Sequence, residues 1–169
     1  KEANQDRNNG TLFAYQVNDP SRYGIVEFNS EFNVLNIQEK PTNPSSNYAI
    51  TGIYFYENSV VSIAKNLKPS KRGELEITDI NNVLLSKNNL KVKLLKRGMA
   101  WLDTGTIDSL HDAGTFIKTI ETRQGLKIGC PEEIAFKLKY IGKKELKKIA
   151  DNYSSSEYGK YLLKLIKNY

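Results

Sequence analysis

The chain has 169 residues, 39% of them hydrophobic and 26% charged, which is the size and composition of one globular domain. It holds no apolar run long enough to cross a bilayer, and residues 1–10 are too polar for a signal peptide, so we expect no membrane partner. The single cysteine, Cys130, excludes an internal disulfide and any cysteine-based zinc site, and it favours a cytoplasmic location.

The formal net charge of +6 could suggest a nucleic acid partner. However, the basic residues gather near the C-terminus, where they alternate with apolar residues at helical spacing. This pattern is typical of amphipathic helices with solvated lysine faces, so we expect no nucleic acid partner. The lysines are Lys143, Lys144, Lys147, Lys148, Lys160, Lys164 and Lys167.

Periodicity and turn residues predict strands and helices that alternate along the chain. Residues 1–10 end in Asn8-Asn9-Gly10, which is typical of a helix end followed by a turn. The expected strands, in chain order, are 11–17, 24–28, 34–38, 48–56, 91–97 and 100–102. The expected helices are 59–67 with Asn58 as its cap, 77–87, a helix between Thr106 and Gly125, one that opens at Pro131, and two lysine-rich helices at the end of the chain.

Strands interleaved with helices indicate an α/β fold. The short runs 24–28 and 34–38 predict a β-hairpin, which favours a mixed sheet over a purely parallel one. The hairpin would bring Tyr23-Gly24 beside Glu39-Lys40, so that both ends could face one ligand. Gly52, in the middle of a predicted strand, favours close approach by a ligand or another backbone.

The motif W-L-D-T-G-T at 101–106 places one carboxylate, Asp103, between an apolar run and the start of a helix. A carboxylate at a strand end can hold a metal ion, and Gly105 would let the chain turn closely around that ion. An aspartate before threonine and glycine is also a common helix cap or turn residue. The motif alone therefore leaves both interpretations open.

Six further motifs accompany it in a characteristic order. They are Y-G-I-V-E-F at 23–28, E-K-P at 39–41, S-N-Y-A-I-T-G at 46–52, G-E-L-E-I-T-D at 73–79, R-Q-G-L-K at 123–127 and C-P-E-E-I at 130–134. In this order and at these spacings they resemble the glucose-1-phosphate thymidylyltransferases, sugar nucleotidyltransferases that make dTDP-glucose. The resemblance runs from Gly10 to the last predicted helix.

The resemblance implies a Rossmann-like nucleotidyltransferase fold. Residues 1–169 would be its C-terminal, sugar-binding portion, with a helical region over about 126–169. The family's glycine-rich loop, with its G-x-G-[ST]-R-L core and catalytic arginine, has no counterpart in this sequence. We therefore expect the N-terminal nucleotide-binding portion to be absent, and we expect this chain to hold no catalytic residue and to be inactive alone.

The resemblance also implies the site residues. It assigns substrate binding to Tyr23, Gly24, Glu39, Lys40, Ile50, Glu76, Thr78 and Trp101, and Mg²⁺ coordination to Asp103. Without the resemblance, Glu39 and Lys40 would be interpreted as a surface ion pair and Trp101 as a core residue. A helix-capping role for Thr78 or Asp79 remains an equal alternative to a role in the sugar pocket.

The segment that ends in Lys137 resembles a part of the family enzymes that contributes to a second nucleotide site. That site serves feedback inhibition by dTDP-rhamnose. Its residues here would be Ile128, Glu133, Ile134 and Lys137. A capped helix at a subunit contact is an alternative role for the same segment. Relatives often have arginine where Lys137 stands, and lysine lacks the bidentate fork of a guanidinium group.

The reaction implied by the resemblance joins dTTP and glucose 1-phosphate to give dTDP-glucose and pyrophosphate with Mg²⁺. Its product would feed deoxysugar synthesis of the dTDP-rhamnose type for a cell-surface polysaccharide, and a homotetramer is expected. Two alternatives remain open. One is uridylyl transfer to the same sugar phosphate, and the other is a non-catalytic module for sugar-nucleotide binding or assembly.

Overall fold

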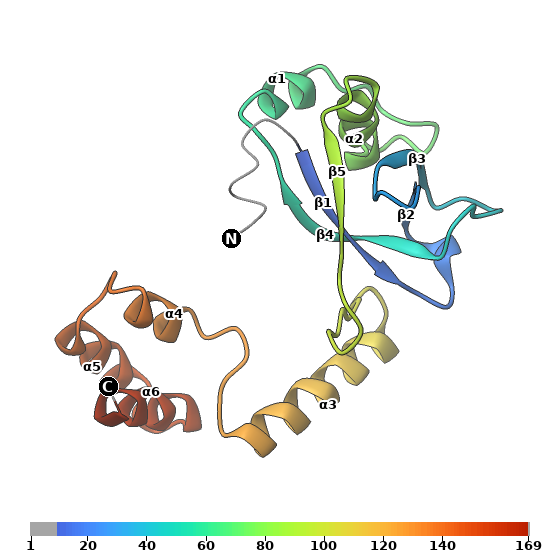
Figure 1. Cartoon of the computed structure of the whole chain (residues 1–169). Coiled ribbons are helices and arrows are strands. Elements are labelled where there is room, and N and C mark those ends of the chain that lie inside the picture. The colour runs from blue at the N-terminus through green and yellow to red at the C-terminus, as the bar shows by residue number, and fades with distance from the viewer. Residues whose placement is uncertain (1–9, 169) are drawn as a thin grey trace. The chain divides into compact units, whose positions relative to one another are not determined.

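The computed structural model describes residues 10–168 and divides the chain into two compact units, the first ending at Trp101 and the second beginning at Leu102 (Figure 1). Each unit is described by itself. The helix expected to end within residues 1–9 lies outside the described residues. Gly10 opens a strand and not the turn that was expected.

The first unit is built on a five-stranded sheet with the order β3-β2-β4-β1-β5 (Figure 1). Its strands are β1 (Gly10–Gln16), β2 (Gly24–Phe28), β3 (Val34–Glu39), β4 (Tyr48–Phe55) and β5 (Leu90–Leu94). Only β1 and β5 run parallel, and every other neighbouring pair is antiparallel. The predicted mixed α/β sheet is therefore confirmed.

The predicted hairpin is confirmed as β2 and β3. Its turn depends on Asn29, whose side-chain oxygen accepts the backbone N–H groups of Glu31 and Asn33, both at 3.0 Å. Such side-chain acceptance is a local substitute for backbone turn bonds. The register pairs Gly24 with Glu39, so the two ends of the hairpin meet as expected.

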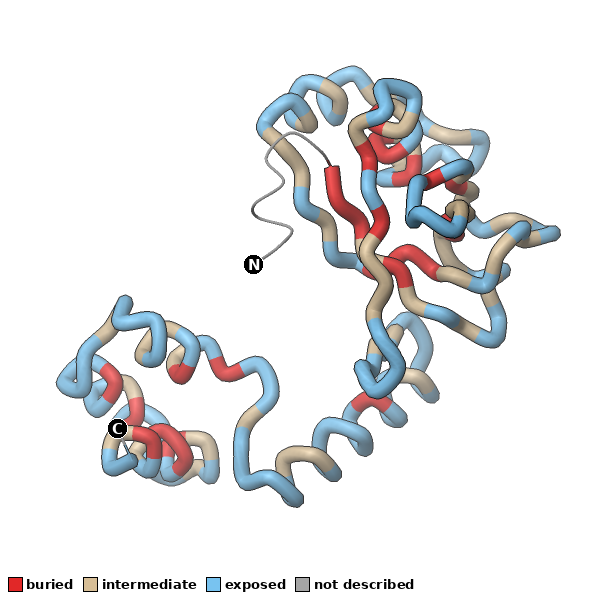
Figure 2. The backbone as a smooth tube through the Cα atoms, in the orientation of Figure 1, coloured by how far each residue is buried: buried red, intermediate tan, exposed pale blue. Residues whose placement is uncertain are grey.

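Helix α2 (Ile77–Ser86) packs on the sheet through Ile80 and Leu84, which share one core with Leu12, Ala14 and Val26. Figure 2 shows buried backbone both on the sheet and on this helix. This apolar face has the helical spacing that the sequence predicted. A short 3-10 turn, η2 (Pro20–Arg22), was not predicted.

Helix α1 (Val60–Lys65) is shorter than the predicted 59–67. It ends at Asn66, whose side-chain amide donates to the Ser62 carbonyl at 2.7 Å and so terminates the helix before Pro69. Ser59, and not Asn58, occupies the N-cap position.

The strands predicted over 91–97 and 100–102 are only partly correct. Strand β5 ends at Leu94, and the chain then turns where the Met99 N–H bonds the Lys96 carbonyl at 3.0 Å. Gly98, with φ of +94°, supplies the left-handed conformation that this turn needs. After the turn, residues 100–104 have no strand neighbour within the described chain, so the strand predicted to lead to Asp103 does not form.

The second unit is helical. It comprises α3 (Ile107–Gln124), α4 (Pro131–Lys137), α5 (Lys143–Asn152) and α6 (Glu157–Asn168). Helix α3 begins at a capping box between Thr106 and Ser109 and ends at Gly125, whose φ is +65°. Among the described helices none is both long and apolar enough to cross a membrane.

Helices α4, α5 and α6 share a small core of Cys130, Leu146, Ala150, Tyr161, Leu162 and Leu165. The lysines of α5 and α6 lie outside this core and are exposed, which confirms the predicted amphipathic pattern. Gly159 in α6 lies against the end of α5, where a Cβ would be 2.1 Å from the Tyr153 carbonyl oxygen. Only glycine fits at that position.

Candidate functional site

Glu39, Thr78 and Gly24 come together from three different elements of the first unit. Thr78, in the first turn of α2, donates its hydroxyl to Glu39 Oε2 at the end of β3, at 2.6 Å. A Cβ on Gly24 would lie 3.1 Å from the same carboxylate oxygen and 3.6 Å from the Thr78 hydroxyl. The glycine therefore keeps open the space in front of a carboxylate that the threonine holds in place.

The helix-capping alternative for Thr78 is wrong. The N-cap position of α2 is Glu76, in an extended conformation, and its side chain makes no capping hydrogen bond. Thr78 lies inside the helix with 5% of its surface exposed, and its hydroxyl bonds Glu39. A buried hydroxyl that holds a carboxylate has a positioning role.

Ile50 of β4 lies on the same side as this cluster. Its Cδ1 is 3.9 Å from the position of a Gly24 Cβ, and the residue is 8% exposed. Its side chain thus forms an apolar wall beside Gly24.

Lys40 follows β3 and turns sharply, with φ of +41°. Its backbone N–H donates to the Tyr23 carbonyl at 3.1 Å, and this bond joins the two ends of the hairpin. Its side chain is exposed. A left-handed lysine is uncommon, and here the backbone bond compensates for the strain.

Glu76 is held by a network that the sequence did not reveal. Arg72 Nη2 donates to Glu76 Oε1 at 2.8 Å, and the Ser70 hydroxyl donates to the same oxygen at 2.9 Å. The bond from Arg72, then that from Ser70, lowers the pKa of the Glu76 carboxyl, and the charge of Lys40 acts in the same direction. The two basic residues at 71–72, followed by acidic residues at 74 and 76, were the available signal for this network.

Aromatic rings lie beside the open end of the hairpin, where Tyr23 precedes Gly24. The Trp101 ring meets Tyr23 edge-on with centroids 5.1 Å apart, and it lies 6.0 Å from the ring of Tyr15. The Arg22 guanidinium carbon lies over the ring of Tyr23, 5.8 Å from its centroid. The first unit therefore contains all eight predicted substrate-binding residues.

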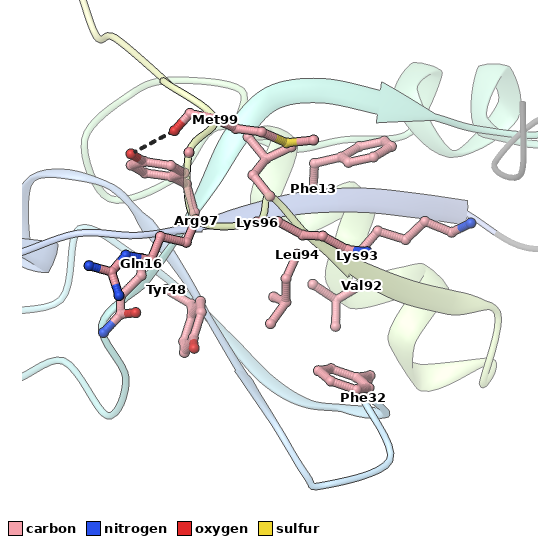
Figure 3. Close-up of a pocket in the computed structure, with 13 residues that line it drawn as sticks. Phe13, Gln16, Phe32, Tyr48, Val92, Lys93, Leu94, Lys96, Arg97 and Met99 are labelled. Atoms are coloured by element: carbon pink, nitrogen blue, oxygen red, sulfur yellow. Dashed lines mark hydrogen bonds between the residues drawn. The ribbon is translucent and has the colours of Figure 1, made fainter.

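A separate cavity of about 1040 Å³ lies along β1 and β5 (Figure 3). Its walls carry Phe13, Phe32, Tyr48 and Leu94, with Lys93, Lys96 and Arg97 among the lining residues. None of the predicted substrate-binding residues lines it. The cavity and the Glu39 cluster are thus distinct features of the first unit.

Asp103 lies in the second unit, in an irregular segment and not at a strand end. Its carboxylate oxygens lie 3.4 and 3.5 Å from the position of a Cβ on Gly105, so the glycine leaves free a position that is in van der Waals contact with the carboxylate. Within residues 10–168 no cluster of three or more acidic, histidine or cysteine side chains could enclose a metal ion. A single carboxylate fits a Mg²⁺ ion that takes its remaining ligands from water and phosphates.

The predicted regulatory residues have unequal environments. Ile128, Ile134 and Lys137 are exposed, whereas Glu133 is buried. The Glu133 carboxylate accepts a hydrogen bond from the Tyr161 hydroxyl and forms an ion pair with Lys137 at 2.5 Å. Glu133 therefore binds two side chains of its own unit.

Comparison with known proteins identifies the family of this chain. The sequence profile described as nucleotidyl transferase matches residues 1–120, well over half of the chain. The chain belongs to the nucleotidyl transferase family. All eight predicted substrate-binding residues fall inside the matched range.

Two glucose-1-phosphate thymidylyltransferases illustrate how similar the relatives of this nucleotidyl transferase are. The one from Neisseria meningitidis serogroup A is 48% identical over 167 residues, which cover 99% of this chain and 58% of the relative. The one from Mycobacterium tuberculosis H37Rv is 51% identical over 162 residues, covering 96% of this chain and 56% of the relative. The chain thus spans little more than half the length of these relatives.

Solved structures agree with the fold of this nucleotidyl transferase. A crystal structure assigned to a glucose-1-phosphate thymidylyltransferase of Bacillus anthracis, in complex with a sucrose, is 40% identical with a TM-score of 0.61. It covers 68% of this chain and 46% of its own. A UDP-glucose pyrophosphorylase bound to UDP-glucose reaches a TM-score of 0.60 at 21% identity, covers 70% of this chain and 48% of its own, and supports the fold alone.

Proposed function

We propose that the protein to which this chain belongs transfers a thymidylyl group from dTTP to glucose 1-phosphate, giving dTDP-glucose and pyrophosphate. The observation that carries the proposal is the Glu39 carboxylate, held by Thr78 at 2.6 Å in front of the open position at Gly24. A fixed carboxylate beside a space without a side chain is suited to accept the hydroxyl hydrogens of a sugar. The activity named for the thymidylyltransferase relatives supplies the reaction.

In the proposed reaction a phosphate oxygen of glucose 1-phosphate attacks the α-phosphorus of dTTP. The bond from that phosphorus to the bridging oxygen breaks, and the electron pair leaves with pyrophosphate. Two anions must approach each other, so the barrier is lowered by positioning and by cations. Lys40, exposed beside Tyr23, and Arg72, beside Glu76, are the cations of the first unit that flank the Glu39 cluster in our proposal.

The proposed reaction requires Mg²⁺, which neutralises phosphate charge when bound. Asp103 would hold the ion, with water and substrate phosphates as the other ligands. The space that Gly105 leaves beside the Asp103 carboxylate supports this role. A second carboxylate and the nucleotide-binding loop would come from the part of the protein that relatives have and this chain lacks, so we expect this chain alone not to turn over.

The remaining features are also proposals. The dTDP-glucose would enter deoxysugar synthesis of the dTDP-rhamnose type in the cytoplasm, and the protein would be a homotetramer. Ile128, Glu133, Ile134 and Lys137 would form a feedback site, in which Lys137 supplies the cation and Glu133 holds it in place. Glu133 would act there through Lys137, because its own carboxylate already binds two side chains.

The deciding experiment measures pyrophosphate release from dTTP, glucose 1-phosphate and Mg²⁺, for this chain and for the full-length protein. Release by the full-length protein alone supports the proposal, whereas a stronger response to UTP would favour uridylyl transfer. Asp103→Asn in the full-length protein should abolish turnover. No release with either nucleotide, together with no effect of Asp103→Asn on assembly, would favour the non-catalytic module.

A further inference from the structure

Tyr15 joins the sheet to the irregular segment that follows β5. Its hydroxyl donates to the Met99 carbonyl at 3.1 Å, across 84 positions of sequence, and Figure 3 draws this bond as a dashed line at Met99. Before it, the Leu95 N–H bonds the Ala14 carbonyl at 2.8 Å, and beyond that point the chain leaves the ladder and turns at Gly98. The Tyr15 hydrogen bond therefore attaches this segment to β1 a second time, after the turn.

The same tyrosine contacts Trp101 through its ring, with centroids 6.0 Å apart and an interplanar angle of 57°. Trp101 in turn packs edge-on against Tyr23, at 5.1 Å and 67°. Tyr23 is the residue whose carbonyl receives the Lys40 N–H, directly beside the paired residues Gly24 and Glu39. A continuous set of contacts thus leads from Tyr15 to the ends of the hairpin.

We propose that Tyr15 is a positioning residue for the sugar phosphate site: its hydroxyl holds the segment 99–101 so that Trp101 supports Tyr23 beside Gly24 and Glu39. This inference rests on the proposed function, because it assumes that the Glu39 cluster binds glucose 1-phosphate. Tyr15 itself need not touch the ligand. Its ring belongs to the cavity of Figure 3, which the substrate-binding residues do not line.

Trp101 depends on the Tyr15 hydroxyl because it lies in a segment without a strand partner in the described chain. Its ring orientation depends on side-chain contacts, and the Tyr15 hydroxyl fixes a carbonyl only two residues away from it. Removing that hydroxyl leaves the tyrosine ring packed but frees the Met99 carbonyl to move. Loss of one such hydrogen bond corresponds to about a 2- to 10-fold change in an equilibrium that depends on it.

The chain offers a direct probe, because Trp101 is its single tryptophan. We would compare Tyr15→Phe with Tyr48→Phe, since Tyr48 lines the same cavity and its ring packs instead on Phe28 at 4.9 Å. Acrylamide quenching of tryptophan fluorescence measures how well the ring of Trp101 is covered without any ligand. We expect Tyr15→Phe, and not Tyr48→Phe, to increase quenching.

Titration with glucose 1-phosphate then tests the consequence for binding, followed by tryptophan fluorescence and by calorimetry. We expect Tyr15→Phe to weaken binding about 2- to 10-fold and Tyr48→Phe to leave it unchanged. In the full-length protein, Tyr15→Phe should raise the KM for glucose 1-phosphate while kcat and the KM for dTTP stay close to those of the parent. A purely structural role would lower kcat and thermal stability without this selectivity.

The outcomes separate the two proposals. If the unmodified chain and the full-length protein both fail to bind glucose 1-phosphate, the sugar site is wrong and the role of Tyr15 falls with it. If they bind it but Tyr15→Phe behaves like Tyr48→Phe in quenching or in affinity, the sugar site stands and the positioning role is overturned.

Discussion

Thr78 and Glu39, 39 positions apart in sequence, are joined by a 2.6 Å hydrogen bond from the threonine hydroxyl to the carboxylate. The bond connects the first turn of α2 to the end of β3, and it is made by a threonine that is almost completely buried. It orients the carboxylate beside Gly24 before any ligand arrives. Preorganised polar groups of this kind avoid the cost of ordering on binding.

Replacing Thr78 by valine keeps the shape of the side chain and removes the donated bond. A hydrogen bond to a charged group contributes about 1.5–3 kcal/mol, so we expect the affinity for glucose 1-phosphate to fall about tenfold or more. Calorimetry on the chain, or the KM of the full-length protein, measures the loss. Thr78→Ser is the matched control, because it keeps a hydroxyl and should retain most of the affinity; equal losses in both variants would contradict this role.

Adding one methyl group at Gly24 tests the open space before the carboxylate. The new Cβ would stand 3.1 Å from Glu39 Oε2, so the glutamate would have to move in Gly24→Ala. We expect weaker binding of glucose 1-phosphate with little change in thermal unfolding. Gly114→Ala, in helix α3, is the control, because its Cβ would meet nothing within 4 Å and should leave binding unaltered.

Gly159→Ala should destabilise the second unit. Its Cβ would lie 2.1 Å from the Tyr153 carbonyl oxygen, and overpacking of this kind costs about 1–3 kcal/mol. Urea unfolding followed by circular dichroism would show a lower midpoint. Gly114→Ala, inside α3 with nothing within 4 Å of its Cβ, should instead gain up to about 1 kcal/mol from helix propensity. A neutral Gly159→Ala would mean that α6 can move away from Tyr153.

Acid stability of the second unit should depend on Tyr161. Burial raises the pKa of the Glu133 carboxyl, but the bonds from Lys137 and Tyr161 outweigh burial and leave this pKa below its ordinary value of 4.5. A carboxylate with a lowered folded-state pKa contributes stability above its unfolded-state pKa, and this contribution is lost as the pH falls through the folded-state value.

Tyr161→Phe removes one of the two bonds that lower the Glu133 pKa, so that pKa should rise and the acid-unfolding midpoint should move to higher pH. The pKa of Tyr161 itself is raised to about 12, chiefly by burial, so its hydroxyl remains a donor throughout this range. NMR titration of the Glu133 carboxyl carbon measures the shift. Tyr153→Phe, at an exposed tyrosine, should not change it.

Local signals predicted the elements whose boundaries are set by neighbouring residues. The capping box at Thr106 and the left-handed Gly125 delimit α3 where the sequence placed the helix, because both act within one turn of the chain. The same holds for the hairpin, whose turn is closed by the Asn29 side chain. The predicted strand at 100–102 failed because a strand requires a neighbouring strand, and no local pattern can supply one.

In the candidate site, too, some contacts follow from the local sequence and others only from the tertiary structure. Residues 23–28 and 34–39 determine by themselves that Gly24 and Glu39 face each other, since alternation and a short polar loop set the register of a hairpin. Only the tertiary structure decided that Thr78 would bond Glu39 and that Tyr15 would hold Met99, 39 and 84 positions away. Hydrogen bonds and ring contacts between distant segments depend on how helices and sheet pack, and periodicity along the chain carries no information about such distances.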